Sequence, residues 1–297
     1  MIVDIARGVA IFLMFVYHFT FDLNYFGVVA FDFNNDLRWL GFRAVIVSLF
    51  SALVGVGLVL GPGRKLDWPR YGKRLLAIGI CAALASAGSY LMFPKTFIFF
   101  GILHFVFVAS VLGLAFMRFK WLNLILGGTL IVIGATTKSA IFDQRPLQWI
   151  GMMTHKPLTE DYVPLLPWFG VVLIGIFLAR RAEAHGWFEN FGKVEFRNPI
   201  AKTLAFGGRH SLIIYMLHQP IFFGLLTLLV GNELPTNNRM KPLPRLAERQ
   251  IEIRIDAPIV GINVIPDMPM KRRIRPIRDA LDVTMFHRIE VKIIHTR

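Results

Sequence analysis

Residues 1–26 read MIVDIARGVAIFLMFVYHFTFDLNYF, which is apolar and long enough to cross a membrane but contains Arg7, His18 and Asp22. A transmembrane helix needs about 20 mostly apolar residues to span a hydrocarbon core of roughly 30 Å. Ionisable side chains in such a helix are costly and usually mark a functional site. This stretch therefore predicts a membrane helix with a functional polar face.

Similar apolar runs recur along most of the chain. The hydrophobic fraction of 55% exceeds the roughly 45–50% that is usual for soluble domains. These runs predict an all-α, polytopic membrane protein with about seven transmembrane helices in one domain, residues 1–230. The predicted spans are residues 5–25, 42–61, 75–93, 97–116, 121–138, 163–180 and 211–230.

The basic residues lie between these spans and predict an orientation. The formal net charge is +14, and Lys and Arg are concentrated in loops 62–74, 117–120 and 180–210, whereas the alternate loops hold fewer. Cytoplasmic loops carry such an excess, so we expect the N-terminus and the rich loops to be cytoplasmic. A basic balance that follows membrane topology argues against nucleic acid as a partner and leaves membrane lipid as the expected surroundings.

The last stretch, residues 231–297, is a polar and basic tail without membrane character. With seven spans and a cytoplasmic N-terminus, this tail would lie outside, against the charge bias. Three explanations stay open: a span is missing, the span count is wrong by one, or the tail is foreign to the fold. We expect no functional site in it.

The charged residues of the first span share a helix face. Arg7 and His18 are eleven residues apart, so at about 100° per residue they lie within roughly 20° of one another and about 16 Å apart along the axis. Asp22, one turn after His18, is placed to accept a hydrogen bond from its imidazole. Asp4 is placed to steady Arg7. Each residue alone also has a packing or anchoring explanation, but their alignment predicts a functional face.

Two further histidines lie at membrane depth. His104 falls about 10 Å below the outer surface by the rise per residue, near the depth of His18. His218 stands two residues before Pro220, which kinks a helix or frees a carbonyl of the preceding turn. Packing would explain each histidine singly, whereas three at this depth favour a shared function.

The segment before the sixth predicted span, TEDYVPLLPWFG, suggests an outer contact. Asp161 and Tyr162 would lie just above the bilayer, where they could orient a polar acceptor and so bind substrate. The ordinary alternative is a belt of aromatic residues at the membrane interface.

Four ordered motifs resemble a known family. They are DIARGVAIFLMFVYH (4–18), GILHFVFVASVLGL (101–114), DYVPLLPWFGVVLIGIFLAR (161–180) and GGRHSLIIYMLHQP (207–220). In order and spacing they resemble the bacterial relatives of the heparan-alpha-glucosaminide N-acetyltransferase catalytic domain. The resemblance implies a bacterial inner-membrane acyltransferase. Such an enzyme takes an acyl group, with acetyl expected, from cytoplasmic acyl-CoA and delivers it to a sugar or polysaccharide on the far side.

The first helix has a second resemblance. Arg7, ten intervening residues and then His18 are similar to the Arg-x10-His pattern of the acyltransferase-3 proteins, which implies a catalytic His18 and an Arg7 that serves acyl-CoA. One departure concerns the lysosomal heparan enzyme, which has Asn where His18 stands and uses a histidine in its first outer loop. This chain has no histidine between positions 19 and 103. Either His18 takes that role, or the bacterial relatives perform different chemistry.

These residues suggest a mechanism for acyl transfer. The phosphates of CoA need cationic partners, for which Arg7, Arg209 and the basic cluster 64–74 are candidates. Neutral His18 would act as general base while Asp22 fixes its tautomer; an acyl-histidine intermediate is the open alternative. The second-rank catalytic candidates, which would polarise the thioester carbonyl or position the acceptor, are His104 and His218.

Two other functions compete with the acyltransferase. A proton-coupled transporter would use Arg7, His18 and Asp22 as a relay, although we see no internal repeat of the kind many transporters contain. A membrane scaffold would use the same charges to hold helices together. No metal is expected, and a homo-oligomer stays open.

Overall fold

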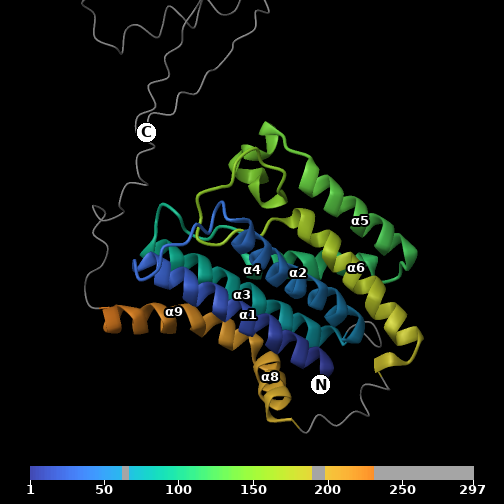
Figure 1. Cartoon of the computed structure of the whole chain (residues 1–297). Coiled ribbons are helices and arrows are strands. Elements are labelled where there is room, and N and C mark those ends of the chain that lie inside the picture. Colours follow the sequence, from blue (N-terminus) through green and yellow to red (C-terminus); the bar gives the residue numbers. More distant parts are fainter. Residues whose placement is uncertain (62–66, 189–197, 231–297) are drawn as a thin grey trace, which may run out of the picture. The chain divides into compact units, whose positions relative to one another are not determined.

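The described residues are mostly helical, in a computed structural model that describes residues 1–61, 67–188 and 198–230 (Figure 1). The only β pairing among these residues is an isolated bridge. The helices are α1 (Ile2–Tyr25), α2 (Leu37–Leu60), α3 (Trp68–Met92), α4 (Ile102–Phe116), α5 (Trp121–Thr136), α6 (Leu165–Ala184), α8 (Pro199–Arg209) and α9 (Ser211–Val230), with short 3₁₀ turns at Ala140–Asp143 and Arg145–Ile150. The predicted all-α membrane class is confirmed.

Five of the described helices are long and apolar enough to cross a membrane: α1, α2, α3, α6 and α9. The apolar helices α4 and α5 are shorter, so the number of seven spans stays a prediction. The fourth predicted span was expected from residue 97, but α4 begins at Ile102. The residues from 97 to Gly101 are not helical, and among them Phe100 forms the isolated bridge with Tyr162. The predicted tail, residues 231–297, lies outside the described residues.

Small residues let the helices of the bundle approach closely. A Cβ atom added to Gly55 of α2 would lie 2.2 Å from the carbonyl oxygen of Val172 in α6. A Cβ added to Gly175 of α6 would lie 2.4 Å from the carbonyl oxygen of Ala52. Small residues at helix interfaces are typical of membrane proteins, where van der Waals contact must drive association. Helices α2 and α6 therefore pack against each other through glycines, Gly55 on α2 and Gly175 on α6.

The short helix α8 is a feature that the sequence analysis treated as part of a loop. Asn198 begins the helix, because its side chain accepts a hydrogen bond from the backbone N–H of Ile200, and Pro199 occupies the first turn. The helix packs against the start of α1. A Cβ on Gly8 would lie 2.0 Å from the carbonyl oxygen of Leu204, so the two backbones are in direct contact.

The bundle has two ends that carry different chemistry. The start of α1, the end of α2, the start of α3 and Phe188 line one cavity, and we call this the Arg7 end. At the opposite end, which we call the loop end, the segment 139–162 binds the residues before α4. There Thr159 Oγ1 donates to the carbonyl of Phe97 at 2.8 Å.

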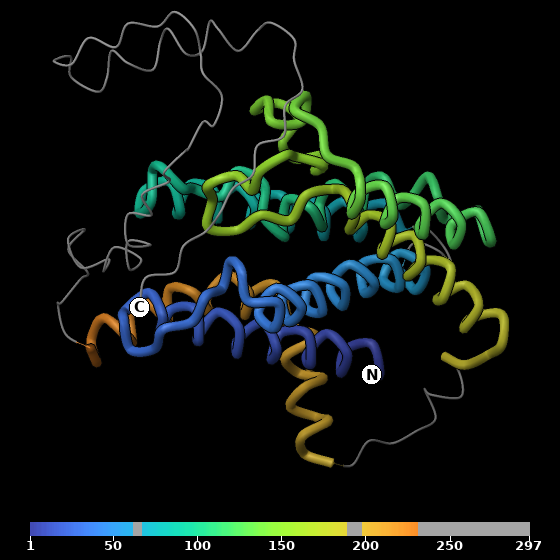
Figure 2. The backbone as a smooth tube through the Cα atoms, turned by 45° about the horizontal axis from the view of Figure 1, so that its top comes forward, coloured from blue at the N-terminus to red at the C-terminus, as the bar shows by residue number. Residues whose placement is uncertain are grey.

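Helix α9 lies beside α1 and runs in the same direction, as both views show (Figures 1 and 2). The aromatic contacts follow this order, because Phe15 meets Phe222 at 5.3 Å between ring centroids and Phe26 meets Phe223 at 5.2 Å. Because α1 and α9 are parallel neighbours, polar residues of the two helices such as His18 and His218 lie side by side.

Candidate functional site

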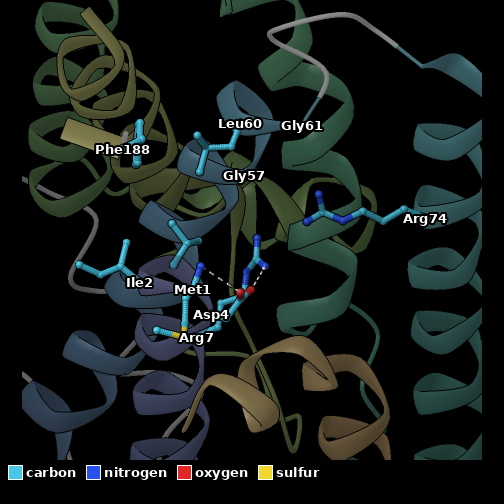
Figure 3. A pocket seen from close by; sticks show the side chains of 10 residues that line it. Met1, Ile2, Asp4, Arg7, Gly57, Leu60, Gly61, Arg74 and Phe188 are labelled. Carbon is cyan, nitrogen blue, oxygen red and sulfur yellow. Dashed lines mark hydrogen bonds and ion pairs between the residues drawn. The ribbon is translucent and has the colours of Figure 1, made fainter. Parts of the chain in front are cut away.

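A cavity of about 400 Å³ opens at the Arg7 end (Figure 3). Its lining comes from four parts of the chain that the alternating helices bring to one end. The residues that line it are Met1, Ile2, Val3, Asp4, Arg7, Gly57, Leu60, Gly61, Arg74 and Phe188.

Two guanidinium groups dominate this cavity. Arg7 Nη1 lies 3.5 Å from Asp4 Oδ1, as the sequence predicted. Arg74 enters from α3 and, among the described residues, has no carboxylate within ion-pair distance. Both groups flank Gly57, since a Cβ there would lie 3.3 Å from Arg7 Nη2 and 3.7 Å from Arg74 Nη2. The cavity thus holds two guanidinium groups and one carboxylate, which pairs with Arg7, and the excess positive charge favours an anionic ligand.

A second predicted CoA contact, Arg209, does not lie at this cavity. It is exposed in the last turn of α8 and does not line the cavity. Arg74 lines the cavity instead, and it belongs to the basic cluster 64–74 that the sequence also offered for the phosphates. The signal was present: Asp67 accepts a hydrogen bond from the N–H of Arg70 and caps α3. That helix start places Arg74 on the second turn, level with the start of α1.

Two histidines meet between α1 and α9. The rings of His18 and His218 lie 5.1 Å apart between centroids, at an angle of 65°. Phe15 stacks on His218 at 5.7 Å, and Tyr17 contacts the edge of His18. The structure therefore brings together two of the predicted catalytic residues, from helices that are about 200 residues apart in the sequence.

His218 is held in one tautomer by a hydrogen bond to its own helix. Its Nδ1 is hydrogen-bonded to the backbone carbonyl of Tyr215. A carbonyl only accepts, so Nδ1 carries the proton and Nε2 keeps its lone pair. His218 is only 5% exposed, and its Nε2 has no partner among the described residues. A neutral imidazole held by a carbonyl, with its second nitrogen free, is the form that a general base requires.

Asp22 has a different partner from the one expected. It is 2% exposed, and its Oδ1 accepts a hydrogen bond of 2.7 Å from Gln219 Nε2 on α9. Its Oδ2 has no partner among the described residues. No hydrogen bond joins Asp22 to His18 in the described structure. Asp22 therefore ties α1 to α9 beside the histidine pair, through a glutamine that the sequence analysis did not single out.

His104 is engaged in capping α4 at the loop end. Ser86 Oγ donates its one proton to the carbonyl of Ile98 at 2.6 Å, so it accepts from His104 Nε2 at 3.1 Å. The backbone N–H of Gly101 donates to His104 Nδ1 at 3.3 Å. Both ring nitrogens are therefore used, with the proton on Nε2. This imidazole has no free nitrogen for proton transfer, and its catalytic role stays a prediction.

Asp161 and Tyr162 also hold the loop end together. Asp161 Oδ2 accepts a hydrogen bond of 2.8 Å from the N–H of Ile102, the first residue of α4. Burial raises the pKa of Asp161, and this hydrogen bond opposes the shift. Tyr162 donates to the carbonyl of Gln148 at 2.6 Å, and burial raises its pKa to about 12. Both side chains have structural partners, so their predicted binding of substrate stays a prediction.

The charged cavity and the histidine pair are separate. The cavity is lined by neither His18, His104 nor His218. Arg7 and His18 are on the same face of α1, about 16 Å apart along its axis. Helix α1 thus connects a cavity that holds two guanidinium groups at one end to an imidazole pair farther along.

The comparison with protein families decides the classification. The family model for heparan-alpha-glucosaminide N-acetyltransferase, catalytic, matches residues 1–220. The chain belongs to this family. The resemblance read from the four motifs is thereby confirmed, and this heparan-alpha-glucosaminide N-acetyltransferase relative is a membrane protein of the acetyltransferase class. Searches of curated proteins and of solved structures gave no match.

Proposed function

We propose that this protein transfers an acetyl group from acetyl-CoA, bound at the Arg7 end, to a sugar acceptor at the pair formed by His18 and His218. The observation that carries the proposal is His218, a buried imidazole with a defined tautomer and a free Nε2, which faces His18 on the same helix as Arg7. Family membership supports the acetyltransferase class.

The donor would bind through its phosphates. Arg7 and Arg74 offer two guanidinium groups in a cavity of about 400 Å³, and a guanidinium matches the geometry of a phosphate with paired N–H donors. Gly57 leaves the space between them open. The residues present therefore fit the anionic part of acetyl-CoA.

The histidine pair would then perform the transfer. As the acceptor nitrogen or oxygen attacks the thioester carbon, His218 Nε2 removes its proton. The neighbouring His18 donates its N–H to the carbonyl oxygen, where negative charge develops. When the C–S bond breaks, CoA leaves as a thiolate and takes the proton from the imidazolium of His218. An acyl-histidine intermediate on His18 would give the same products in two steps.

The proposed orientation of the protein is consistent with the same arrangement. The basic loops predict a cytoplasmic Arg7 end in a bacterial inner membrane. Helix α9 runs parallel to α1, which fits an odd number of crossings from the first helix to the last. The donor site would then face the compartment that holds acetyl-CoA, and the acceptor would approach from outside.

The test is acetyl transfer by purified protein in detergent, with radiolabelled acetyl-CoA as donor and glucosamine as acceptor probe. We expect labelled N-acetylglucosamine from the wild type and a loss of at least 100-fold in kcat for His218→Gln. Arg74→Gln should raise KM for acetyl-CoA about tenfold or more. The matched control is Arg118→Gln, an exposed arginine that does not line the cavity. Wild-type protein that neither binds acetyl-CoA nor releases CoA would refute the proposal.

A further inference from the structure

One buried side-chain bond joins α1 and α9 next to the histidine pair. Gln219 Nε2 donates to Asp22 Oδ1 at 2.7 Å. Gln219 directly follows His218 on α9, and Asp22 lies one helical turn after His18 on α1. The bond therefore fixes one helix against the other within a turn of the point where the two imidazoles meet.

This hydrogen bond contributes little to the free energy of folding. It leaves two atoms, Asp22 Oδ2 and Gln219 Oε1, buried without partners among the described residues. A buried polar group without a partner costs about 1–3 kcal/mol, and a half-satisfied network is less stable than an apolar one. Polar pairs of this kind are retained in some proteins because they set the register of helices. The same logic makes apolar replacements here compatible with folding.

Helix α9 also needs an external constraint at this position. Pro220 has no N–H, so the carbonyl of Met216, four residues earlier, loses its helical partner. The carbonyl of Tyr215 accepts from His218 as well. Helix α9 thus lacks one backbone hydrogen bond beside His218, and the bond from Gln219 to α1 supplies a constraint from outside the helix.

We propose that Gln219 is a positioning residue, which uses the Asp22 carboxyl group to set α9 against α1 and so holds His218 opposite His18. This role rests on the proposed function, because it concerns the placement of the base assigned there. Gln219 touches neither donor nor acceptor in this scheme and acts only through His218.

The test combines kinetics with a direct measure of helix register. Gln219→Met has similar length and volume but cannot donate, and Asp22→Leu removes the same bond from the other helix. To measure the register, the single native cysteine is first removed by Cys81→Ser. Phe19→Cys and Phe222→Cys are then introduced together, since these two rings face each other across α1 and α9 with centroids 5.4 Å apart. The yield of a short thiol cross-linker between them is measured by mass spectrometry. Thr227→Val is the control, since it removes a hydrogen bond within α9 away from the pair.

We expect Gln219→Met and Asp22→Leu each to lower the cross-linking yield and to lower kcat about 10- to 100-fold, because small displacements of a catalytic group cost that much. KM for acetyl-CoA should not change, because the donor cavity lies at the other end of α1. Asp22→Asn keeps an oxygen that accepts from Gln219 and should keep the wild-type cross-linking yield. Thr227→Val should match the wild type in both measurements.

Two results would overturn the positioning role. The first is wild-type cross-linking and kcat in Gln219→Met; the second is a yield for Asp22→Asn as low as that for Asp22→Leu, which would assign the effect to charge instead. A wild type without transferase activity would refute the proposed function alone, since the cross-linking still reports whether Gln219 sets the register.

Discussion

Gly57 lies between the guanidinium groups of Arg7 and Arg74, where a side chain as large as leucine would occupy the space between them. A Cβ there would lie 3.3 Å from Arg7 Nη2, a distance at which the neighbouring atom must move. We predict that Gly57→Leu raises KM for acetyl-CoA tenfold or more, a loss of about 1.4 kcal/mol per factor of ten, with little change in kcat. Steady-state kinetics at saturating acceptor probe measure both quantities.

The control for this change is Gly128→Leu on α5, where an added Cβ meets nothing within 4 Å. It adds the same volume to a helix outside the cavity, and its KM should equal that of the wild type. A normal KM in Gly57→Leu would remove acetyl-CoA from the cavity flanked by Arg7 and Arg74.

Asp161 gives the loop end a dependence on pH. Its pKa is raised above the ordinary value of about 3.9 by burial, so the folded protein binds the proton more tightly than the unfolded chain. The stability from this group is present in full below the ordinary value and is lost as the pH rises through the raised pKa. We predict that Asp161→Asn, which keeps an oxygen to cap α4, has a higher melting temperature than the wild type at pH 8. At pH 3.5 this difference should be smaller, and an equal difference at both pH values would contradict the assignment.

Part of the site could be predicted from single residues, and part could not. The spacing of Arg7 and His18 placed both on one helix face, and Asp4 was correctly paired with Arg7. The partner of Asp22 was not foreseen, because Gln219 is 197 residues away along the chain and helical spacing says nothing about which helix packs alongside. For His104, the predicted depth assumed a helix from residue 97, whereas α4 begins at Ile102, and its partner Ser86 lies on another helix, α3.

At the scale of helices, the contact of α1 with α8 supports the donor cavity. A Cβ on Gly208 would lie 1.8 Å from the carbonyl oxygen of Asp4, which is backbone and cannot rotate away. Gly208→Ala should therefore push α8 from the start of α1 and lower the melting temperature in detergent by several degrees. Gly207→Ala is a closely matched control, because a Cβ on this adjacent residue meets nothing within 4 Å. Equal melting temperatures for the two variants would contradict the observed packing.

The helices could be predicted from the sequence where a long apolar run marks them. Helices α1, α2, α3, α6 and α9 fall on predicted spans. Helix α8 was not predicted, because it has too few apolar residues to read as a span, although Asn198 and Pro199 are strong start signals. The late start of α4 depends on the bridge between Phe100 and Tyr162, a long-range pairing that no local pattern contains.

For the whole molecule, the alternating helices make a definite prediction about sidedness. The loop that contains His155 and the loop that contains Arg118 belong to opposite sides in the orientation given by the basic loops. We predict that a cysteine at position 155, introduced as His155→Cys after Cys81→Ser, reacts with a membrane-impermeant maleimide in intact cells. Arg118→Cys should react only after the membrane is opened. Both native side chains are exposed, so burial does not account for a difference. The reverse pattern would place Arg7 and Arg74 outside, away from cytoplasmic acetyl-CoA, and would refute the proposed direction of transfer.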